Sequence, residues 1–199
     1  MITTDSIKTA ATKIAQLMED SADELNAADG LLGDGDLGIT MVRGFREIIR
    51  VRDSLPDEVG MALFLCAKAF TKSSGSSYGT LLATGLMSVA KKKKGQQEIQ
   101  VEEISALLND ALDAMKQRGK AELGDKTVLD VIAASSQAAK DQSGGSQVIK
   151  AINDAVTSTI DEFRSRQSKI GRARIFSEKS IGLDDPGMLA FRKMLEALG

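Results

Sequence analysis

The stretch Asp29–Ile39 reads Asp-Gly-Leu-Leu-Gly-Asp-Gly-Asp-Leu-Gly-Ile and places three carboxylates among four glycines. Because glycine lets the backbone fold tightly, this stretch can turn Asp29, Asp34 and Asp36 toward one point. Three anionic groups at one point repel one another unless a cation lies between them, and Mg²⁺ or Ca²⁺ takes oxygen ligands of this kind. Aspartate and glycine are also common in solvated turns, so the spacing leaves open both a metal site and an exposed acidic turn.

Apolar residues on both sides of this stretch recur at helical spacing. Tryptophan is absent and aromatic residues make up 4% of the chain, while alanine, leucine, lysine and glutamate are plentiful, and this composition favours helices. Pro56 is placed to open a helix, and the lysines at 91–94 before Gly95 are typical of a helix end. We expect eight helices, at about residues 7–25, 38–54, 56 to beyond 70, 76 to the lysines at 91–94, 101–118, 125–140, 147–166 and 186–198.

These helices are predicted to form one all-α domain, residues 1–199. Short loops make consecutive helices antiparallel, and no alternating strand pattern, internal repeat or domain linker interrupts their order. The long connection at about residues 167–185 is rich in glycine and shows little periodicity. Long connections of this kind in compact domains are often functional.

The composition excludes several classes of function. A net charge of −2 gives no basic field that would attract nucleic acid. The single cysteine, Cys66, cannot form an internal disulfide, and its apolar surroundings predict a core position. Without histidine the chain has no imidazole to act as a base or a metal ligand. No signal peptide or bilayer-spanning run is evident, so we expect a cytoplasmic protein that does not bind membranes.

Residues 33–38 match the dinucleotide-binding pattern G-x-G-x-x-G, but we reject that interpretation. The pattern requires a preceding β-strand, and a helical segment precedes it here. An EF-hand is also excluded, because the acid spacing differs and no ligating glutamate follows at the required place. Two aspartates would repel a pyrophosphate directly, whereas carboxylates that bind Mg²⁺ would attract it through the metal.

Other polar, glycine-containing segments also precede expected helices. They are residues 73–80, residues 124–127, and residues 171–173 with residues 184–187. Hydroxyl and backbone N–H groups at a helix N-terminus bind anions, although an ordinary capped helix start uses the same residue types. Together with the acidic stretch, these segments place such loops before four helices, as a barrel of helices with a ligand at one end would require.

Four motifs follow one another along the chain. They are Leu25-Asn26-x-x-Asp29-Gly30-x-x-Gly33-Asp34-Gly35-Asp36-x-Gly38-x-Thr40-Met41, Ser74-Gly75-x-x-Tyr78-Gly79-Thr80, Arg118-Gly119-Lys120-Ala121-x-x-Gly124-Asp125-Lys126-Thr127-x-x-Asp130, and Gly171-Arg172-Ala173 with Asp185-Pro186-Gly187. Their order resembles that of the nucleotide-binding L subunit of dihydroxyacetone kinase, over about residues 25–187. The resemblance implies an eight-helix antiparallel up-and-down barrel with the nucleotide site at one end, in agreement with the helix count.

The resemblance also implies the chemistry of the site. In this family the loop aspartates bind two Mg²⁺ ions that hold the phosphates of ADP or ATP, and here Asp29, Asp34 and Asp36 take that place. No catalytic residue beyond this metal site is implied on the chain itself. The implied nucleotide contacts are Leu37, Gly38, Thr40, Ser73, Ser74, Gly119, Val128, Arg172, Asp185, Pro186 and Gly187.

The resemblance further implies a phosphotransferase that is active only with a partner. In the family a separate K subunit holds the ketose, and the phosphoryl donor is ATP or a protein of the phosphotransferase system. We also expect a homo-oligomer. The rival interpretation is a non-catalytic nucleotide-binding protein with a regulatory or interaction role.

Two positions depart from the family pattern. Where the family usually has histidine, after the third aspartate and often shortly before the Asp-Pro-Gly turn, this chain has Leu37 and Leu183. Leucine cannot donate a side-chain hydrogen bond to phosphate, so contact at Leu37 is expected from its backbone N–H. The segments at residues 29–38, 73–79 and 167–185 are expected to form a rim on which the partner docks, with the Leu37 side chain on the substrate side of that rim. The change bears on the substrate and the mode of phosphoryl transfer more than on nucleotide binding, and it is compatible with a related ketose or tetrulose kinase.

Overall fold

The computed structural model describes residues 1–73 and 75–199, and this part of the chain is built almost entirely from helices. Its strands, β1 (Ile2–Thr3) and β2 (Glu98–Ile99), form one short antiparallel pair. Its 3₁₀ segments are η1 (Arg52–Ser54), η2 (Val101–Glu103) and η3 (Ala173–Ser180). Its α-helices are α1 (Thr4–Asp20), α2 (Ala22–Leu32), α3 (Leu37–Val51), α4 (Val59–Ser73), α5 (Ser77–Lys92), α6 (Ile104–Gly119), α7 (Val128–Ala139), α8 (Gly145–Arg164) and α9 (Pro186–Glu196).

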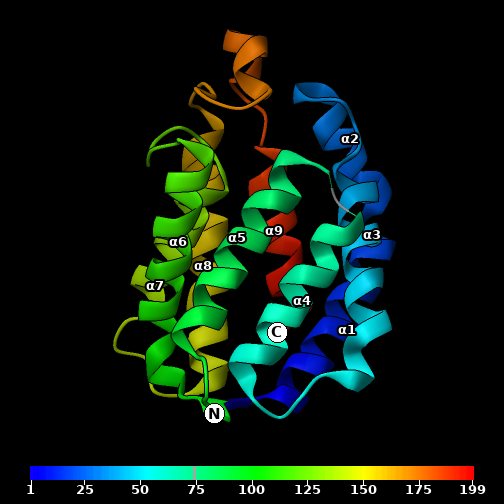
Figure 1. Cartoon of the computed structure of the whole chain (residues 1–199). Helices are drawn as coiled ribbons and strands as arrows, with labels where there is room; N and C mark the ends of the chain where they lie inside the picture. The colour runs from blue at the N-terminus through cyan, green and yellow to red at the C-terminus, as the bar shows by residue number, and fades with distance from the viewer. Residues whose placement is uncertain (74) are drawn as a thin grey trace.

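Eight of the helices in the described chain close into a ring, whose helices stand upright in Figure 1. Consecutive helices from α3 to α9 pack against one another, α1 packs against α3, and α9 returns to pack against α1. Short connections make the neighbours antiparallel. The predicted all-α barrel of antiparallel helices is therefore confirmed. The remaining helix, α2, continues from α1 at one end of the barrel and packs against α3 and α9.

One predicted helix, residues 7–25, is two helices in the structure. α1 and α2 meet at Ser21, whose backbone N–H donates to the carbonyl of Leu17 over 2.9 Å and caps the end of α1. Fully buried apolar side chains continue across this break, from Met18 to Leu25. The hydrophobic pattern therefore gave no sign that the chain changes direction.

The break has a consequence for the acidic stretch, which was expected to be one loop. α2 extends to Leu32 and carries Asp29 on its last turns. The connection to α3 is therefore only residues 33–36. The three carboxylates come from the end of one helix, a short loop and the start of the next helix.

Most other predicted boundaries agree with the structure to within a few residues. Pro186 is the first residue of α9, as predicted, but α4 begins at Val59 and not at Pro56. The strand pair was not predicted, because two residues per strand are too few to show alternation; in it Ile2 lies opposite Ile99. The stretch at residues 167–185 contains η3.

Apolar side chains fill the inside of the ring. Met41, Val131 and Ala190 are completely buried in one continuous hydrophobic cluster. Cys66 is buried in the same cluster, as predicted, and burial raises the pKa of its thiol to about 11. A thiol with this pKa is not ionised near neutral pH, which removes it as a nucleophile. Among the described helices, none combines the length and the apolar character needed to cross a membrane.

Candidate functional site

Four helices begin at the same end of the barrel, the end beneath η3 in Figure 1. Their N-cap residues are Asp36 for α3, Ser76 for α5, Thr127 for α7 and Asp185 for α9. The first N–H groups of a helix lack partners within the helix, and the helix dipole is positive there. Four such ends around one space make it favourable for an anion.

A cavity of about 720 Å³ opens at this end. Most of the residues that the resemblance implied lie on its wall, although they come from five separate parts of the sequence. Those that line it are Asp29, Asp34, Asp36, Leu37, Thr40, Ser73, Gly119, Val128, Arg172, Asp185, Pro186 and Gly187.

Two implied residues are not among those that line the cavity. Ser74 lies outside the described residues. Gly38 is in the first turn of α3, where a Cβ atom would come within 2.1 Å of the carbonyl oxygen of Ala22. The close packing of α3 against α2 therefore explains why glycine is needed at this position.

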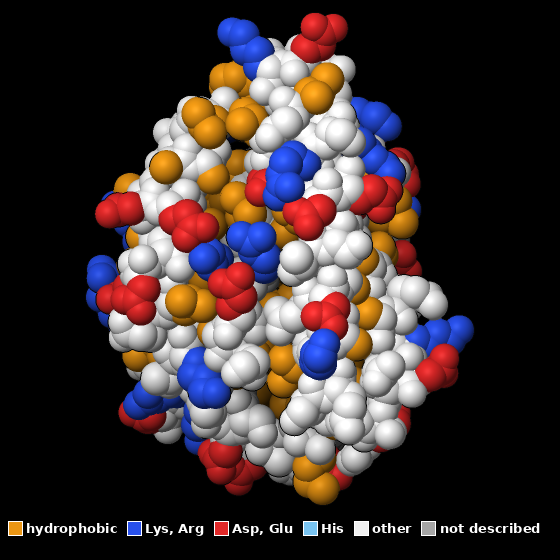
Figure 2. All heavy atoms as spheres, turned by 180° about the vertical axis from the view of Figure 1, so that it is seen from behind, with side chains coloured by type: hydrophobic (Ala, Val, Ile, Leu, Met, Phe, Trp, Pro, Cys, Tyr) orange, Lys and Arg blue, Asp and Glu red, His pale blue; other side chains and the backbone are white. Residues whose placement is uncertain are grey.

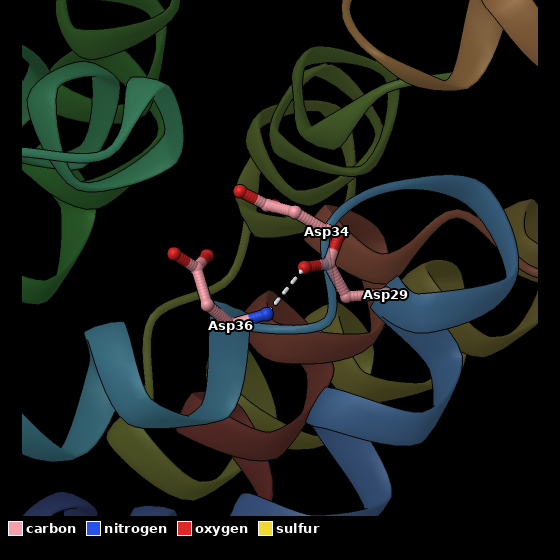
Figure 3. Close-up of side chains that lie close together, drawn as sticks. All are labelled: Asp29, Asp34 and Asp36. Carbon is pink, nitrogen blue, oxygen red and sulfur yellow. Dashed lines mark hydrogen bonds between the residues drawn. The ribbon is translucent and has the colours of Figure 1, made fainter.

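The three aspartates form a compact cluster at the cavity. One carboxylate oxygen from each of Asp29, Asp34 and Asp36 lies within 4.8 Å of the others. Figure 3 shows the side chains of Asp34 and Asp36 extending to the same side, with Asp29 beside the turn that joins them. Gly35 permits this turn, because its φ of +75° lies in the left-handed region that favours glycine.

Asp29 also fixes the backbone of this turn. Its Oδ2 atom accepts hydrogen bonds from the backbone N–H groups of Asp36 (3.0 Å) and Leu37 (3.3 Å) (Figure 3 draws the first). The N–H of Leu37, which was expected to contact phosphate, is therefore already bound to a carboxylate.

The expected position of the Leu37 side chain is wrong. This side chain is only 6% exposed and belongs to the hydrophobic core, so it does not stand on the rim. An apolar side chain at the first position of α3 gains more from the core than from solvent.

The donor atoms of the cluster fit a hard divalent cation. Carboxylate oxygens are the ligands that Mg²⁺ and Ca²⁺ take, and the carboxylate of Asp36 makes no capping hydrogen bond that would compete. The guanidinium of Arg172, in the connection between α8 and α9, forms an ion pair with Asp34. The site therefore already attracts positive charge to the acidic cluster.

Another part of the cavity wall is formed by the start of α9. The Asp185 carboxylate caps this helix by accepting from the N–H of Met188 over 2.9 Å, and burial raises its pKa to about 7. The hydroxyl of Tyr78, from α5, donates to the carbonyl of Gly187 over 3.1 Å and so ties this turn to the neighbouring wall. Burial also raises the pKa of the Tyr78 hydroxyl, which therefore stays protonated as a donor.

Sequence reasoning assigned no contact to two arginines on the cavity wall, although Arg118 begins the third motif. Arg43 on α3 and Arg118 on α6 line the cavity, and each is exposed, with no ion-pair partner among the described residues. Arg43 lies one helical turn after Thr40, so helical spacing from an implied contact was the signal that could have found it. Arginine side chains at such positions can neutralise the charge of a bound phosphate.

Exposed hydrophobic side chains surround the same end of the barrel. Figure 2 shows hydrophobic atoms on the surface near this end. Exposed apolar side chains gathered at one end of a protein can belong to a protein interaction site. We call the following residues the apolar rim: Leu31, Ile39, Leu123, Ile175 and Ile181.

The chain is similar in sequence and in fold to kinases of short ketoses. The chain is 27% identical to the ADP-binding subunit DhaL of the PEP-dependent dihydroxyacetone kinase of Escherichia coli, over 94% of this chain and 91% of that protein. It is 31% identical to L-erythrulose 1-kinase of Mycolicibacterium smegmatis, over 92% of this chain but only 33% of that protein.

Among solved structures, the dihydroxyacetone kinase of C. freundii in complex with AMP-PNP and Mg²⁺ superimposes with a TM-score of 0.75 at 25% identity. The match covers 96% of this chain and 33% of that one. The sequence model of the DAK2 domain matches residues 31–199, which is most of the chain. The chain therefore belongs to the DAK2 domain family.

Proposed function

We propose that this chain is the nucleotide-carrying subunit of a two-component ketose kinase of the dihydroxyacetone kinase type, and that it binds ADP or ATP together with Mg²⁺. The observation that carries the proposal is the cluster of Asp29, Asp34 and Asp36 at a cavity where four helices begin. Carboxylates attract the metal, and the helix N-termini attract the phosphates that the metal bridges. Neither feature alone would suit a magnesium nucleotide as well as the two together.

Different residues of the cavity would contact the phosphates and the nucleoside. Asp29, Asp34 and Asp36 would hold Mg²⁺, which neutralises phosphate charge when bound. Thr40, Ser73 and the first turn of α5 offer hydroxyl and N–H donors to phosphate oxygens. The base and sugar would lie against the wall formed by Gly119, Val128 and residues 185–187.

Catalysis by this chain would consist of orientation and charge neutralisation. The sequence has no histidine, and the carboxylate of Asp185 on the cavity wall is used to cap α9, so the group that accepts a proton from the sugar hydroxyl would come from the partner. We propose a K-type subunit as that partner, docked on the apolar rim. The L-erythrulose 1-kinase among the relatives supports short ketoses as the substrate class.

Finer features belong to the same proposal. By resemblance to the family we propose two Mg²⁺ ions, a homo-oligomer and a cytoplasmic location. The donor is either ATP or a phosphotransferase-system protein that phosphorylates bound ADP. The PEP-dependent name of the E. coli relative supports the second of these donors.

The direct test is binding followed by turnover. Calorimetry should show Mg-ADP binding that is lost when EDTA is added. A coupled assay with Mg-ATP and dihydroxyacetone or erythrulose should show product only when a cognate K-type subunit is present. Mg-ADP binding without turnover in any combination would favour the rival, a non-catalytic nucleotide-binding protein. Turnover by the isolated chain would contradict the two-component mechanism.

A further inference from the structure

Lys126 is a buried cation outside the cavity wall. Its side chain is only 1% exposed, and it lies in the loop between α6 and α7 with a left-handed φ of 63°. Its Nζ atom donates to three backbone carbonyls, those of Arg164 (3.3 Å), Arg166 (2.8 Å) and Ser180 (2.8 Å). An ammonium group has three N–H donors, so each of them has an acceptor here. Burial lowers the pKa of Lys126, and the nearby carboxylates of Asp185 and Asp184 oppose that effect.

The three acceptors lie at the two ends of one segment, residues 165–182. Arg164 is the last residue of α8, Arg166 lies two positions after it, and Ser180 is the last residue of η3. Lys126 therefore joins the start of this segment to its end. We call this arrangement the Lys126 clasp.

Further hydrogen bonds reinforce the Lys126 clasp. The backbone N–H of Ser168 donates to Oγ of Ser180 over 2.9 Å, and both residues are almost completely buried. The N–H of Lys169 donates to the carbonyl of Asp125 over 3.1 Å, which ties the segment to the loop that carries Lys126. The base of the segment is thus a buried polar structure, whereas its outer part at Ile175 is 78% exposed.

The outer part of this segment carries Arg172, which lines the cavity and pairs with Asp34. The ion pair between Arg172 and Asp34 is exposed to solvent, and exposed ion pairs are weak. The position of the Arg172 side chain therefore depends mainly on the position of the backbone of residues 165–182. A rigid base is what would hold the guanidinium over the acidic cluster. Lys126 itself does not line the cavity, although its neighbours Thr127 and Val128 do.

We propose that Lys126 is a positioning residue for nucleotide binding: it fixes the base of residues 165–182 and thereby holds Arg172 at the phosphates, without touching the nucleotide. This inference rests on the proposed function, because a role for Arg172 at the phosphates requires that the chain binds a nucleotide. Its structural half, the anchoring of the segment, stands on the hydrogen bonds alone and can be tested without nucleotide.

The first experiment is a double-mutant cycle on Mg-ADP affinity, measured by calorimetry. Arg172→Ala and Lys126→Met should each lower the affinity roughly tenfold, the size expected when one charged hydrogen bond is lost. If Lys126 acts through Arg172, the double variant should bind about as well as either single variant. Additive losses would show that Lys126 affects binding by another route and would overturn the proposal.

The matched control is Lys169→Met, which removes an exposed lysine from the same segment but none of the clasp hydrogen bonds. Its affinity should equal that of the wild type, and a loss as large as that of Lys126→Met would contradict the specific role of Lys126. Should Lys126→Met fail to fold, Ser180→Ala takes its place in the cycle. Ser180→Ala removes the hydroxyl that accepts from the N–H of Ser168 but leaves the Ser180 carbonyl that Lys126 binds. The loss of Mg-ADP affinity caused by Ser180→Ala should again vanish in the Arg172→Ala background. No loss, or an equal loss in both backgrounds, would overturn the proposal.

Amide hydrogen exchange tests the anchoring by itself. In Lys126→Met, or in Ser180→Ala if that variant is used, exchange should quicken in residues 165–182 and stay unchanged in α1 and α4. Unchanged protection of the segment would overturn the inference whether or not the protein binds nucleotide. Quickened exchange in a protein whose wild type does not bind Mg-ADP would refute the proposed function and the assignment of Arg172 to phosphate, and would leave only the anchor.

Discussion

Oδ2 of Asp29 lies 3.0 Å from the backbone nitrogen of Asp36, so one carboxylate of the acidic cluster holds the backbone that presents another. The same oxygen accepts from the N–H of Leu37. The Asp36 side chain does not stabilise the backbone in this way, since it makes no capping hydrogen bond. Two residues that look equivalent in the sequence therefore have different structural roles, although both are proposed to bind the metal.

This difference predicts opposite effects on the stability of the metal-free protein. Asp29→Ala removes the acceptor of two backbone N–H groups and should destabilise the fold by about 1–3 kcal/mol, a fall of several degrees in Tm. Asp36→Asn keeps a good N-cap residue and removes one of three repelling charges, so it should raise stability by up to about 1 kcal/mol. Thermal unfolding in EDTA measures both.

Both substitutions should nevertheless weaken Mg-ADP binding, by at least about tenfold each, because each removes a proposed metal ligand. Calorimetry in Mg²⁺ provides this comparison. Unchanged Mg-ADP affinity in Asp36→Asn would contradict the assignment of the cluster to the metal.

Mg²⁺ and nucleotide together should stabilise the protein more than either alone. A ligand that binds only the folded state adds about 2.7 kcal/mol at a hundredfold excess over its Kd, which for a chain of this size raises Tm by about 5–11 °C. Differential scanning fluorimetry with ADP, Mg²⁺ and both is the measurement. Equal shifts from ADP with and without Mg²⁺ would speak against a metal-bridged complex.

Asp185 predicts a pH dependence of stability. Burial raises the pKa of Asp185 to about 7, while Lys126 opposes this rise and Asp130 adds to it. The folded protein therefore binds this proton more tightly than the unfolded chain, and the contribution of Asp185 to stability falls as pH rises from about 4 to about 7.

Asp185→Asn keeps a side chain that can cap α9 but removes the ionisation. Relative to the wild type, this variant should gain stability at about pH 8 and gain little at about pH 4. Tm measured for both proteins across this range checks the prediction. A stability difference that does not change with pH would show that Asp185 ionises normally in the fold.

The apolar rim predicts a surface for the partner. Ile175→Asp replaces an exposed apolar side chain of η3 by a charge, and it should weaken association with a K-type subunit by about tenfold or more if this side chain is buried in the complex. Mg-ADP affinity of the isolated chain should not change, because Ile175 does not line the cavity. Phe64→Asp on α4, an exposed apolar residue away from this end, is the matched control. Equal effects of the two substitutions would refute the rim as the docking surface.

Much of the fold could be predicted because it depends on local patterns. Helical spacing and start signals such as Asp185-Pro186 located most of the helices. The break at Ser21 was missed because the buried pattern continues across it. The strand pair was missed because its two-residue strands depend on a partner far away in the sequence.

The site was predicted in its composition but not in its internal contacts. Glycine-rich spacing and the resemblance selected residues that the fold does bring to one cavity, and their binding roles remain predictions. The inward packing of Leu37 and the ion pair of Arg172 with Asp34 depend on tertiary packing that no local pattern contains. Arg43 could have been found from its helical spacing to Thr40, but its lack of an ion-pair partner within the described residues is visible only in the fold.

The ring closes where α9 meets α1, and this closure sets the order in which the cavity can assemble. One wall comes from α2 and α3, and another from the start of α9, so the two meet only through contacts between distant parts of the chain. Closing a long loop costs more chain entropy than pairing neighbouring helices, so we expect these contacts to form after the local helix pairs. A partly folded state in which α9 has not docked would lack part of the cavity wall, and a ligand that binds only the closed ring would therefore disfavour its opening.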